Sequence, residues 1–297
     1  MKELLVLSGK GGTGKTTITG ALAVLMENKV LADCDVDAAD LHLILRPQNR
    51  EEHEFWSGIE AHFDQERCTG CGTCATLCRF HAIAMQDGKA QPLPFSCEGC
   101  GVCAKFCPEG AITLADKLCG AWYIADTAHG PMVHARLGIG EENSGRLVAL
   151  VKNKAREVAE AVRADWLLVD GPPGIGCPVI ASLAGVTLVL LVTEPSRSGL
   201  HDLERVAQLA AHFKVPAVAC LNKCDLEPGC AAEIERFCSG AQIPLLGRIP
   251  FDRAVVEAIV QGRSLLEHAA DAPAALAVRE LWEKLSRYAP ETAPKKP

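Results

Sequence analysis

The chain alternates short runs of hydrophobic residues with longer amphipathic stretches. Residues 4–7, 30–33 and 166–170 form apolar runs typical of buried strands, and residues 16–26 and 147–162 have the period of helices. Further strand-like runs occur at residues 122–125, 188–193, 215–221 and 245–249. Strands that alternate with helices predict an α/β fold with a doubly wound, mostly parallel sheet.

Residues 57–117 interrupt this pattern and hold two cysteine-rich runs. We therefore expect residues 1–56 and 118–288 to form one discontinuous domain, with residues 57–117 inserted into it as a small α+β domain. The tail at 289–297 is rich in Pro and Lys and is predicted to be disordered.

Composition narrows the class of protein. Of the 297 residues, 48% are hydrophobic and only 5% aromatic, which favours an α/β domain over a β-sandwich. The formal net charge of −7 argues against non-specific binding of nucleic acid. The longest apolar run, 183–192, is too short to span a membrane, and no signal peptide is visible. We expect a cytoplasmic protein, in which cysteines bind metal more often than they form disulfides.

The first strand-like run leads into a glycine-rich loop. Residues 9–16 have the sequence G-K-G-G-T-G-K-T, which matches the phosphate-binding pattern G-x-x-x-x-G-K-[ST]. A strand before it and a helix after it argue against a chance turn. Lys15 is expected to reach the β- and γ-phosphates, and Thr16 to bind Mg²⁺. The predicted nucleotide contacts of this loop are Gly11, Gly12, Thr13, Gly14, Lys15, Thr16 and Thr17.

Aspartates follow two of the strand-like runs. Asp33, Asp35 and Asp37 stand two residues apart, so that alternation along a strand would point them to one face. Asp37 and Asp40 could instead cap the following segment.

Asp170 ends another strand and precedes Gly-Pro-Pro-Gly. It is predicted to hold the Mg²⁺ shell, with the N–H of Gly174 facing the γ-phosphate. The alternative is a tight turn with a capping aspartate.

Residues 222–225, with the sequence N-K-C-D, follow a strand and have the form of a base-recognition motif. Asn222 is the candidate for contact with adenine. Because N-K-x-D is also a guanine signature, this motif leaves GTP open as the nucleotide.

Two cysteine runs share the spacing C-x2-C-x2-C-x3-C, the bacterial ferredoxin signature for [4Fe–4S] clusters. They consist of Cys68, Cys71, Cys74, Cys78 and of Cys97, Cys100, Cys103, Cys107. A short hydrophobic tail follows each run, at 82–84 and 111–113, so the arrangement is an internal repeat. In two-cluster ferredoxins the fourth cysteine of each run ligates the other cluster. Cys107 would then complete the first cluster and Cys78 the second. Arg79 stands where the second run has Pro108.

The other cysteines are Cys34, Cys119, Cys177, Cys220, Cys224, Cys230 and Cys238. Cys34 and Cys220 fit the pattern of small buried hydrophobic residues. Cys224 and Cys230 could form a minor metal site, although a fortuitous pair is the simpler interpretation.

The phosphate loop holds a second lysine, Lys10, and the form G-K-G-G-x-G-K-T-T resembles the MinD/ParA (deviant Walker A) ATPases. Residues 142–145, 174–178, 193–195 and 198–202 resemble the members of that superfamily that carry an inserted ferredoxin domain. Members act as nucleotide-dependent dimers, so the resemblance implies a homodimer or a heterodimer with a paralogue in the ATP state.

The resemblance also implies roles for single residues. Lys10 would cross to the nucleotide of the partner subunit, and Asp35 would orient the attacking water. Pro250, Phe251 and Asp252 would form the second base-side loop. Cys177 lies at the distance from Asp170 at which the related nitrogenase iron protein has a ligand of its bridging cluster. The companion ligand, expected within 141–144, is not a cysteine.

Four functions fit these patterns. We expect a slow, partner-stimulated ATPase that holds ATP or ADP, Mg²⁺ and two [4Fe–4S] clusters, and that couples nucleotide state to electron transfer or metal-cluster handling for a partner protein. The alternatives are a cluster-assembly carrier of the Mrp type, a positioning ATPase like MinD or ParA, and an amidation or ligation enzyme. A positioning role needs a membrane helix or a DNA-binding surface, and residues 275–288 carry mixed charge typical of a packed helix. Amidation would leave eight cluster cysteines unexplained.

Overall fold

The computed structural model describes residues 1–141 and 143–288, which form two compact units. The first unit comprises Met1–Glu52, Trp122–Arg136 and the described part of 144–297. The second comprises His53–Ala121 and the described part of 137–143. The tail expected to be disordered and Glu142 lie outside the described residues.

Strands and helices alternate through the first unit. In chain order its elements are β1 (Lys2–Ser8), α1 (Lys15–Leu25), β2 (Lys29–Asp33), α2 (Leu41–Leu45), β7 (Gly130–Leu137), α5 (Ser144–Ala161), β8 (Trp166–Pro173), α6 (Cys177–Leu183), β9 (Leu188–Thr193), α7 (Arg197–His212), β10 (Ala217–Asn222), α8 (Pro228–Gly240), β11 (Leu245–Ile249), α9 (Arg253–Val260), α10 (Leu265–His268) and α11 (Pro273–Tyr288). Strands β3 (Gln48–Phe63) and β6 (Ile112–Thr127) have residues in both units, as does β7 through its last residue, Leu137.

Within the described residues one sheet has nine strands, in the order β11-β10-β9-β1-β8-β2-β7-β6-β3. From β11 to β7 neighbouring strands are parallel. The two-residue connection between β6 and β7 requires that this pair be antiparallel. The register sets Val6 of β1 and Asp33 of β2 beside Asp170 of β8. The carboxyl ends of these strands therefore meet at one sheet edge.

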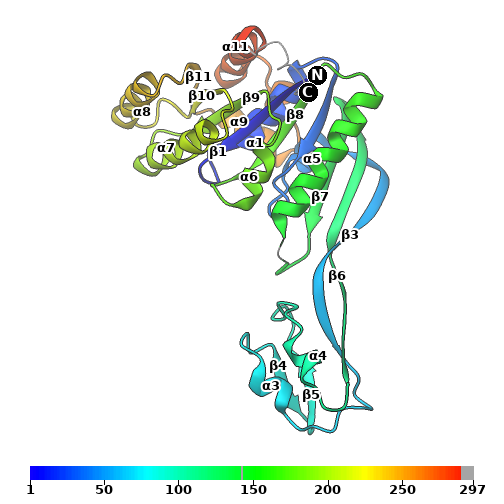
Figure 1. The fold of residues 1–297 in the computed structure, drawn as a ribbon. Coiled ribbons are helices and arrows are strands. Elements are labelled where there is room, and N and C mark those ends of the chain that lie inside the picture. The colour runs from blue at the N-terminus through cyan, green and yellow to red at the C-terminus, as the bar shows by residue number, and fades with distance from the viewer. Residues whose placement is uncertain (142, 289–297) are drawn as a thin grey trace. The chain divides into compact units, whose positions relative to one another are not determined.

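Helices cover both faces of this sheet. Helices α5, α6, α7 and α8 pack on one face, as Figure 1 shows in front of the strands, and α1, α10 and α11 contact the other. The main core joins strand residues such as Leu4 and Leu168 to Leu22 of α1 and Val278 of α11. The mostly parallel α/β architecture predicted from the hydrophobic pattern is confirmed. Helix α11 buries one side in this core, as its amphipathic sequence indicated.

The second unit contains short elements around the cysteine runs. These are α3 (Thr73–Leu77), β4 (Ile83–Gln86), β5 (Lys89–Pro92) and α4 (Val102–Lys105), with β4 and β5 paired as an antiparallel two-stranded sheet. Its small core consists of Ala61, Cys74, Ala90 and Ile112, with other cysteines packed against it. Thiols therefore make up much of this small core, beside a few large apolar side chains such as Phe63 and Ile83.

Three expectations about local structure were wrong. Residues 112–113 and the hydrophobic run at 122–125 belong to one strand, β6, whose residues 114–118 are mostly exposed and so lack an apolar pattern. The tails of the two cysteine runs therefore differ, since β4 has four residues and β6 has sixteen. Strand β2 ends at Asp33, so the alternation of aspartates along a strand does not occur.

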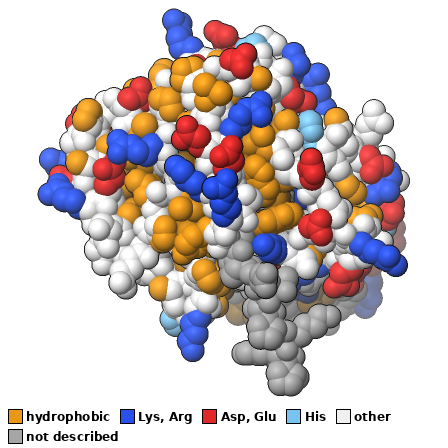
Figure 2. Space-filling model, turned by 90° about the horizontal axis from the view of Figure 1, so that it is seen from above, with side chains coloured by type: hydrophobic (Ala, Val, Ile, Leu, Met, Phe, Trp, Pro, Cys, Tyr) orange, Lys and Arg blue, Asp and Glu red, His pale blue; other side chains and the backbone are white. Residues whose placement is uncertain are grey.

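Charges of both signs are interspersed with hydrophobic side chains on the face seen in Figure 2, where the visible part has no continuous basic area. Among the described residues, no helix combines the length and the apolar character needed to cross a bilayer.

Candidate functional site

The phosphate loop joins β1 to α1 at the sheet edge. Gly12 and Gly14 have φ of 80° and 90°, a left-handed conformation that glycine adopts without strain. A Cβ on Gly14 would also lie only 2.2 Å from Asn222 Nδ2. The backbone of this loop therefore requires glycine on two counts, and it delivers Lys15 to the first turn of α1.

Lys15 lies among carboxylates at the start of α1. Its Nζ is 3.0 Å from Asp170 Oδ1 and 3.4 Å from Asp35 Oδ2. Asp170 is fully buried and accepts hydrogen bonds from the hydroxyls of Thr16 and Thr19, both at 2.8 Å. The structure thus brings together Lys15, Thr16, Asp35 and Asp170, which the sequence predicted from three separate segments. Thr19 was not predicted, although its place one helical turn after Lys15 was a signal.

Burial and charge act against each other in this cluster. Burial disfavours the charged form of Lys15, but the carboxylates of Asp170, Asp35 and Asp33 outweigh it and raise the pKa of its ammonium. Burial, aided by the neighbouring Asp170, raises the pKa of Asp33 and of Asp35 despite the attraction of Lys15. One buried cation thus faces three acidic groups, a charge excess that suits a site for a further cation.

The three spaced aspartates have different environments. Asp33 is fully buried and accepts hydrogen bonds from the backbone N–H groups of Asp35 and Leu41, so it organises the loop after β2. Asp37 is exposed. Asp40 occupies the N-cap position of α2 but makes no side-chain capping bond, and it lines the cavity described next.

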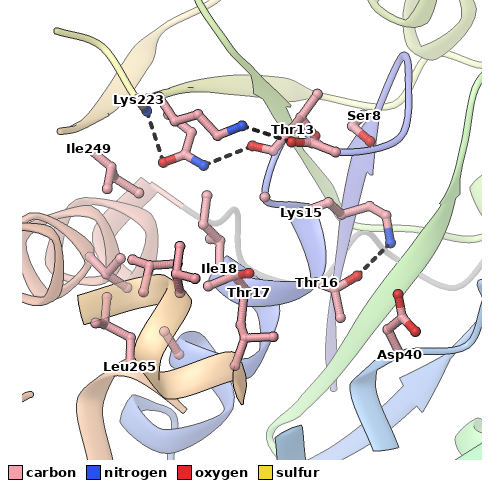
Figure 3. Close-up of a pocket in the computed structure, with 18 of the residues that line it drawn as sticks. Ser8, Thr13, Lys15, Thr16, Thr17, Ile18, Asp40, Lys223, Ile249 and Leu265 are labelled. Carbon is pink, nitrogen blue, oxygen red and sulfur yellow. Dashed lines mark hydrogen bonds between the residues drawn. The ribbon is translucent and has the colours of Figure 1, made fainter. Parts of the chain in front are cut away.

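A cavity of about 560 Å³ opens beside the phosphate loop. Figure 3 shows Lys15 and Thr16 on one side of it and the apolar side chains of Ile249 and Leu265 on the other. Thr13 Oγ1 is buried in the loop without a hydrogen-bond partner. A ligand with a polyanionic group at the phosphate loop and an apolar, aromatic group among the apolar side chains would fit these two sides of the cavity. An orphaned buried hydroxyl is consistent with a polar ligand that completes the loop.

The base-side residues lie at the apolar end. Asn222, Pro250, Phe251 and Asp252 all line the cavity. Asn222 donates from Nδ2 to the carbonyl of Thr13 at 2.8 Å, which ties the end of β10 to the phosphate loop.

Asp252 has a structural role in addition to its place in the cavity. Its Oδ1 accepts from Ala254 N at 2.9 Å as the cap of α9, and its Oδ2 accepts from Ala274 N at 3.2 Å. Asp225, the residue that a guanine motif requires, does not line the cavity, and its Oδ1 accepts from Phe251 N at 2.7 Å. Both carboxylates are thus engaged by backbone, which disfavours recognition of guanine.

The Lys10 side chain makes its contacts within its own chain. Its Nζ lies 2.8 Å from Glu194 Oε1 and 2.8 Å from Ser198 Oγ, while Lys223 Nζ lies 2.8 Å from Glu194 Oε2. Partial burial would raise the pKa of Glu194, but the two lysines outweigh burial and lower it. Glu194 therefore forms ion pairs with both Lys10 and Lys223. The sequence provided no indication of this role beyond the motif at 193–195.

Gly174 follows β8 with φ of 88°. Its N–H donates to the Ser8 carbonyl at 2.9 Å, so in this conformation it does not face the phosphate loop's cavity. A contact of this N–H with a phosphate would require residues 174–176 to move.

The second unit contains two cysteine-lined cavities. Cys68, Cys71, Cys74 and Cys107 line one of them, here called the first site. Cys97, Cys100, Cys103 and Cys78 line the other, the second site. Each cavity thus gathers three thiols of one run and the fourth thiol of the other run. Phe63 lines both cavities.

The backbone around the two sites is matched. Gly70 and Gly99 have φ of 75° and 63°, and a Cβ there would lie 1.9 Å from the carbonyl oxygen of Gly88 and 2.1 Å from that of Ile59, respectively. The N–H groups of Ala82 and Ala111 donate to Cys78 Sγ and Cys107 Sγ, both at 3.3 Å. Four thiols with donors aimed at sulfur are the donor set that [4Fe–4S] clusters use.

The remaining cysteines differ in environment. Cys34, Cys119, Cys220 and Cys238 are buried, and burial raises the pKa of Cys119 and of Cys238 to about 11. Cys177 is exposed at the start of α6. Among the described residues, no three or more His, Cys, Asp or Glu side chains are already arranged as a metal site, around Cys224 and Cys230 or elsewhere. Arg79 is exposed and lines neither cysteine cavity.

Comparisons with known proteins agree with the fold. The chain is 32% identical over 292 residues to an uncharacterized protein of Methanocaldococcus jannaschii, covering 96% of this chain and 97% of that one. It is 22% identical to the cytosolic Fe-S cluster assembly factor NUBP2 homolog of Trichoplax adhaerens, covering 95% and 93% of the two chains. The septum site-determining protein MinD of Pyrococcus horikoshii, solved with Mg-ADP, has a TM-score of 0.57 at 19% identity, with 99% of both chains covered.

A family match covers most of the chain. Residues 4–265 match the CobQ/CobB/MinD/ParA nucleotide binding domain, a span that includes the phosphate loop, the buried Asp170 and both cysteine runs. The chain therefore belongs to the CobQ/CobB/MinD/ParA nucleotide-binding domain family.

Proposed function

We propose that this protein binds and hydrolyses Mg·ATP and couples its nucleotide state to electron transfer, or to metal-cluster handling, through two [4Fe–4S] clusters in the second unit. The observation that carries the proposal is the crosswise set of thiols. Each cysteine cavity takes its fourth thiol from the other run, the arrangement of two-cluster ferredoxins. Each cluster would supply a carrier for one electron.

The nucleotide half of the proposal rests on Lys15 and its neighbours. Lys15 is held by Asp170 and Asp35 and is already positioned at the loop, so an arriving triphosphate would compete with carboxylates for it. Thr16 and Asp170 would hold Mg²⁺, which would neutralise charge on the β- and γ-phosphates. A hydroxyl and a carboxylate in contact at 2.8 Å fit such a hard cation.

Asp35 is proposed to orient the attacking water. It is buried and lines the cavity, Lys15 lies beside one of its oxygens, and a carboxylate has lone pairs for a further hydrogen bond from water. Asn222 is proposed to contact adenine. Lys10 is proposed to act on the nucleotide of a second subunit, which would require that Glu194 release it.

The test is an anaerobic EPR and redox titration of the full chain with and without Mg·ATP. A shift in potential or line shape on addition of Mg·ATP would support coupling. Asp35→Ala should lower single-turnover hydrolysis by about 100-fold while ATP still binds, and it should accumulate an ATP-bound dimer. Hydrolysis at the wild-type rate in Asp35→Ala would remove Asp35 from the mechanism.

A second candidate is a carrier ATPase that delivers a cluster to a partner. It is favoured by the relative named as a cytosolic Fe-S cluster assembly factor and by the exposed thiol of Cys177 at the start of α6. Transfer of iron and sulfide to an apo-ferredoxin acceptor, lost in Cys177→Ser, would support it. Two clusters that stay bound in the presence of acceptor and Mg·ATP would favour electron transfer.

A further inference from the structure

The two cysteine sites are built on the same local frame. Helix α3 begins at Thr73 and α4 begins at Val102, in each case between the second and third cysteines of a run. The preceding glycines, Gly72 and Gly101, have nearly equal dihedral angles, φ 76° and ψ −5° against φ 74° and ψ −1°. Thr73 and Val102 are therefore equivalent positions, and both side chains are half-buried in the cavity walls.

The two equivalent residues differ in one chemical respect. Thr73 Oγ1 lies 3.4 Å from Cys71 Sγ and forms a hydrogen bond with it. As a thiol, Cys71 donates this bond, but a ligand thiolate has no proton, so the Thr73 hydroxyl would then be the donor. The side chain of Val102 has no group that could donate to Cys100. The first site thus has one O–H···S bond for which the second site has no counterpart at this position.

The rest of the lining strengthens the contrast. Phe80, Ile83 and Leu114 line the second site. Ile112 lines the first, together with Thr69 and Thr73, and no threonine among the described residues lines the second. Carboxylates do not offset this difference, because each cavity has one, Glu109 at the first site and Glu98 at the second. The exposed Arg79 lines neither cavity.

Hydrogen bonds to sulfur stabilise the more negative, reduced form of a cluster, and an apolar wall destabilises it. We propose that Thr73 sets the redox order of the two sites, so that the first site has the higher reduction potential and receives the electron from the second. This inference rests on the proposed function, since it requires that both sites hold clusters. One electron leaves the second site and enters the first, with no proton transfer. The electron comes from an external low-potential one-electron donor.

Phe63, which lines both cysteine cavities, lies between the two sites on the proposed path of the electron. Cys71 and Cys100 are both exposed, so each site has one thiol at the surface. An electron accepted at the Cys100 side would therefore come to rest at the Cys71 side, from which an acceptor would collect it.

The test is a potentiometric titration followed by EPR on the anaerobically reconstituted full chain, with dithionite as reductant. Thr73→Val reproduces the second site at the first and should lower the higher of two potentials, by about tenfold in electron affinity or ~59 mV for one electron. Thr73→Ser keeps the hydroxyl and should restore the wild-type value. The matched variant Val102→Thr should instead raise the lower potential.

The outcomes separate this inference from the function on which it rests. Two clusters whose potentials are unchanged in Thr73→Val, or a shift of the lower potential in that variant, would overturn the role of Thr73 and leave the proposed function standing. A reconstituted chain with no bound iron and sulfide would overturn the proposed function and this inference with it. A shift confined to the higher potential in Thr73→Val, and to the lower one in Val102→Thr, would support both.

Discussion

The two units of this protein are ordered by different means. In the unit with the phosphate loop, β1, β2, β8 and β9 are buried almost throughout, and they pack on helices with large apolar side chains. In the cysteine unit the core cluster consists of four residues, Ala61, Cys74, Ala90 and Ile112. The apolar core of the first unit is thus far larger than that of the second, and small domains with little apolar core commonly depend on a metal or a disulfide for stability.

The largest effect is expected from a substitution that removes ATP binding by the phosphate-loop unit and leaves the cysteine unit unchanged. Lys15→Ala would leave Asp170 and Asp35 without the cation that pairs with them, and removing one partner of a buried pair costs about 3–5 kcal/mol. It would also remove the charge expected to bind the β- and γ-phosphates, so ATP affinity should fall at least ~100-fold. Isothermal titration with ATP measures this loss.

Its control is the iron content of the other unit. Because Lys15 lies in the phosphate-loop unit, iron and sulfide per chain should stay at the wild-type level in Lys15→Ala. Unchanged ATP affinity would refute the assignment of the phosphate loop.

The next prediction concerns a substitution that removes iron from the cysteine unit and leaves ATP binding unchanged. Cys74 is buried in the small core and lines the first site. Cys74→Ser should remove about half of the bound iron and make the second unit sensitive to proteolysis, because metal binding and folding are coupled in domains with little apolar core. ATP affinity should stay within about twofold of wild type.

Cys230→Ser is the matched control, since Cys230 lines neither cysteine cavity. Loss of iron from this control, or full retention of iron by Cys74→Ser, would contradict the assignment of the first site.

The difference in burial between the two units also explains which strands could be predicted from the sequence. The buried strand 188–193 was found with its observed bounds, because both faces of the strand are covered and its residues form an unbroken apolar run. Strand β3 was missed, since its first seven residues are exposed or half-exposed. The residues that meet at the phosphate loop could be named from motifs. Glu194 could not, because its role depends on Lys10 and Lys223, which approach it from distant segments.

A smaller effect is expected at Glu194, which links two lysines near the nucleotide cavity. Glu194→Gln keeps the shape but removes the charge that holds Lys10 and Lys223. These side chains are partly exposed, so each ion pair contributes at most about 1 kcal/mol. If Glu194 restrains Lys10, its removal should raise ATP-dependent dimer formation by about two- to fivefold, as measured by light scattering.

The surface pair of Glu157 and Lys154 provides the control, because Glu157→Gln removes an exposed ion pair on α5. A Glu194→Gln variant that dimerises no better than Glu157→Gln would show that Glu194 does not restrain Lys10.

The last prediction concerns the pH dependence of stability in the phosphate-loop unit alone. His134 on β7 is buried beside the rings of His42 and Tyr123, and its Nε2 lies 3.1 Å from Asn49 Oδ1. Burial, with a smaller contribution from His42, lowers the pKa of His134 from 6.5 to about 4. The folded chain therefore binds fewer protons than the unfolded chain between these values, so stability falls as pH decreases from 6.5 toward 4.

Each pH unit in this window should cost at most about 1.4 kcal/mol of unfolding free energy through His134. His134→Gln, which retains a donor for Asn49, should flatten the dependence in urea unfolding of the phosphate-loop unit, whereas His201→Gln at an exposed position should not. An equal slope in wild type and His134→Gln would mean that other groups carry the acid sensitivity. Because His134 and its partners all lie in the first unit, unfolding of the cysteine unit should show no change between these variants.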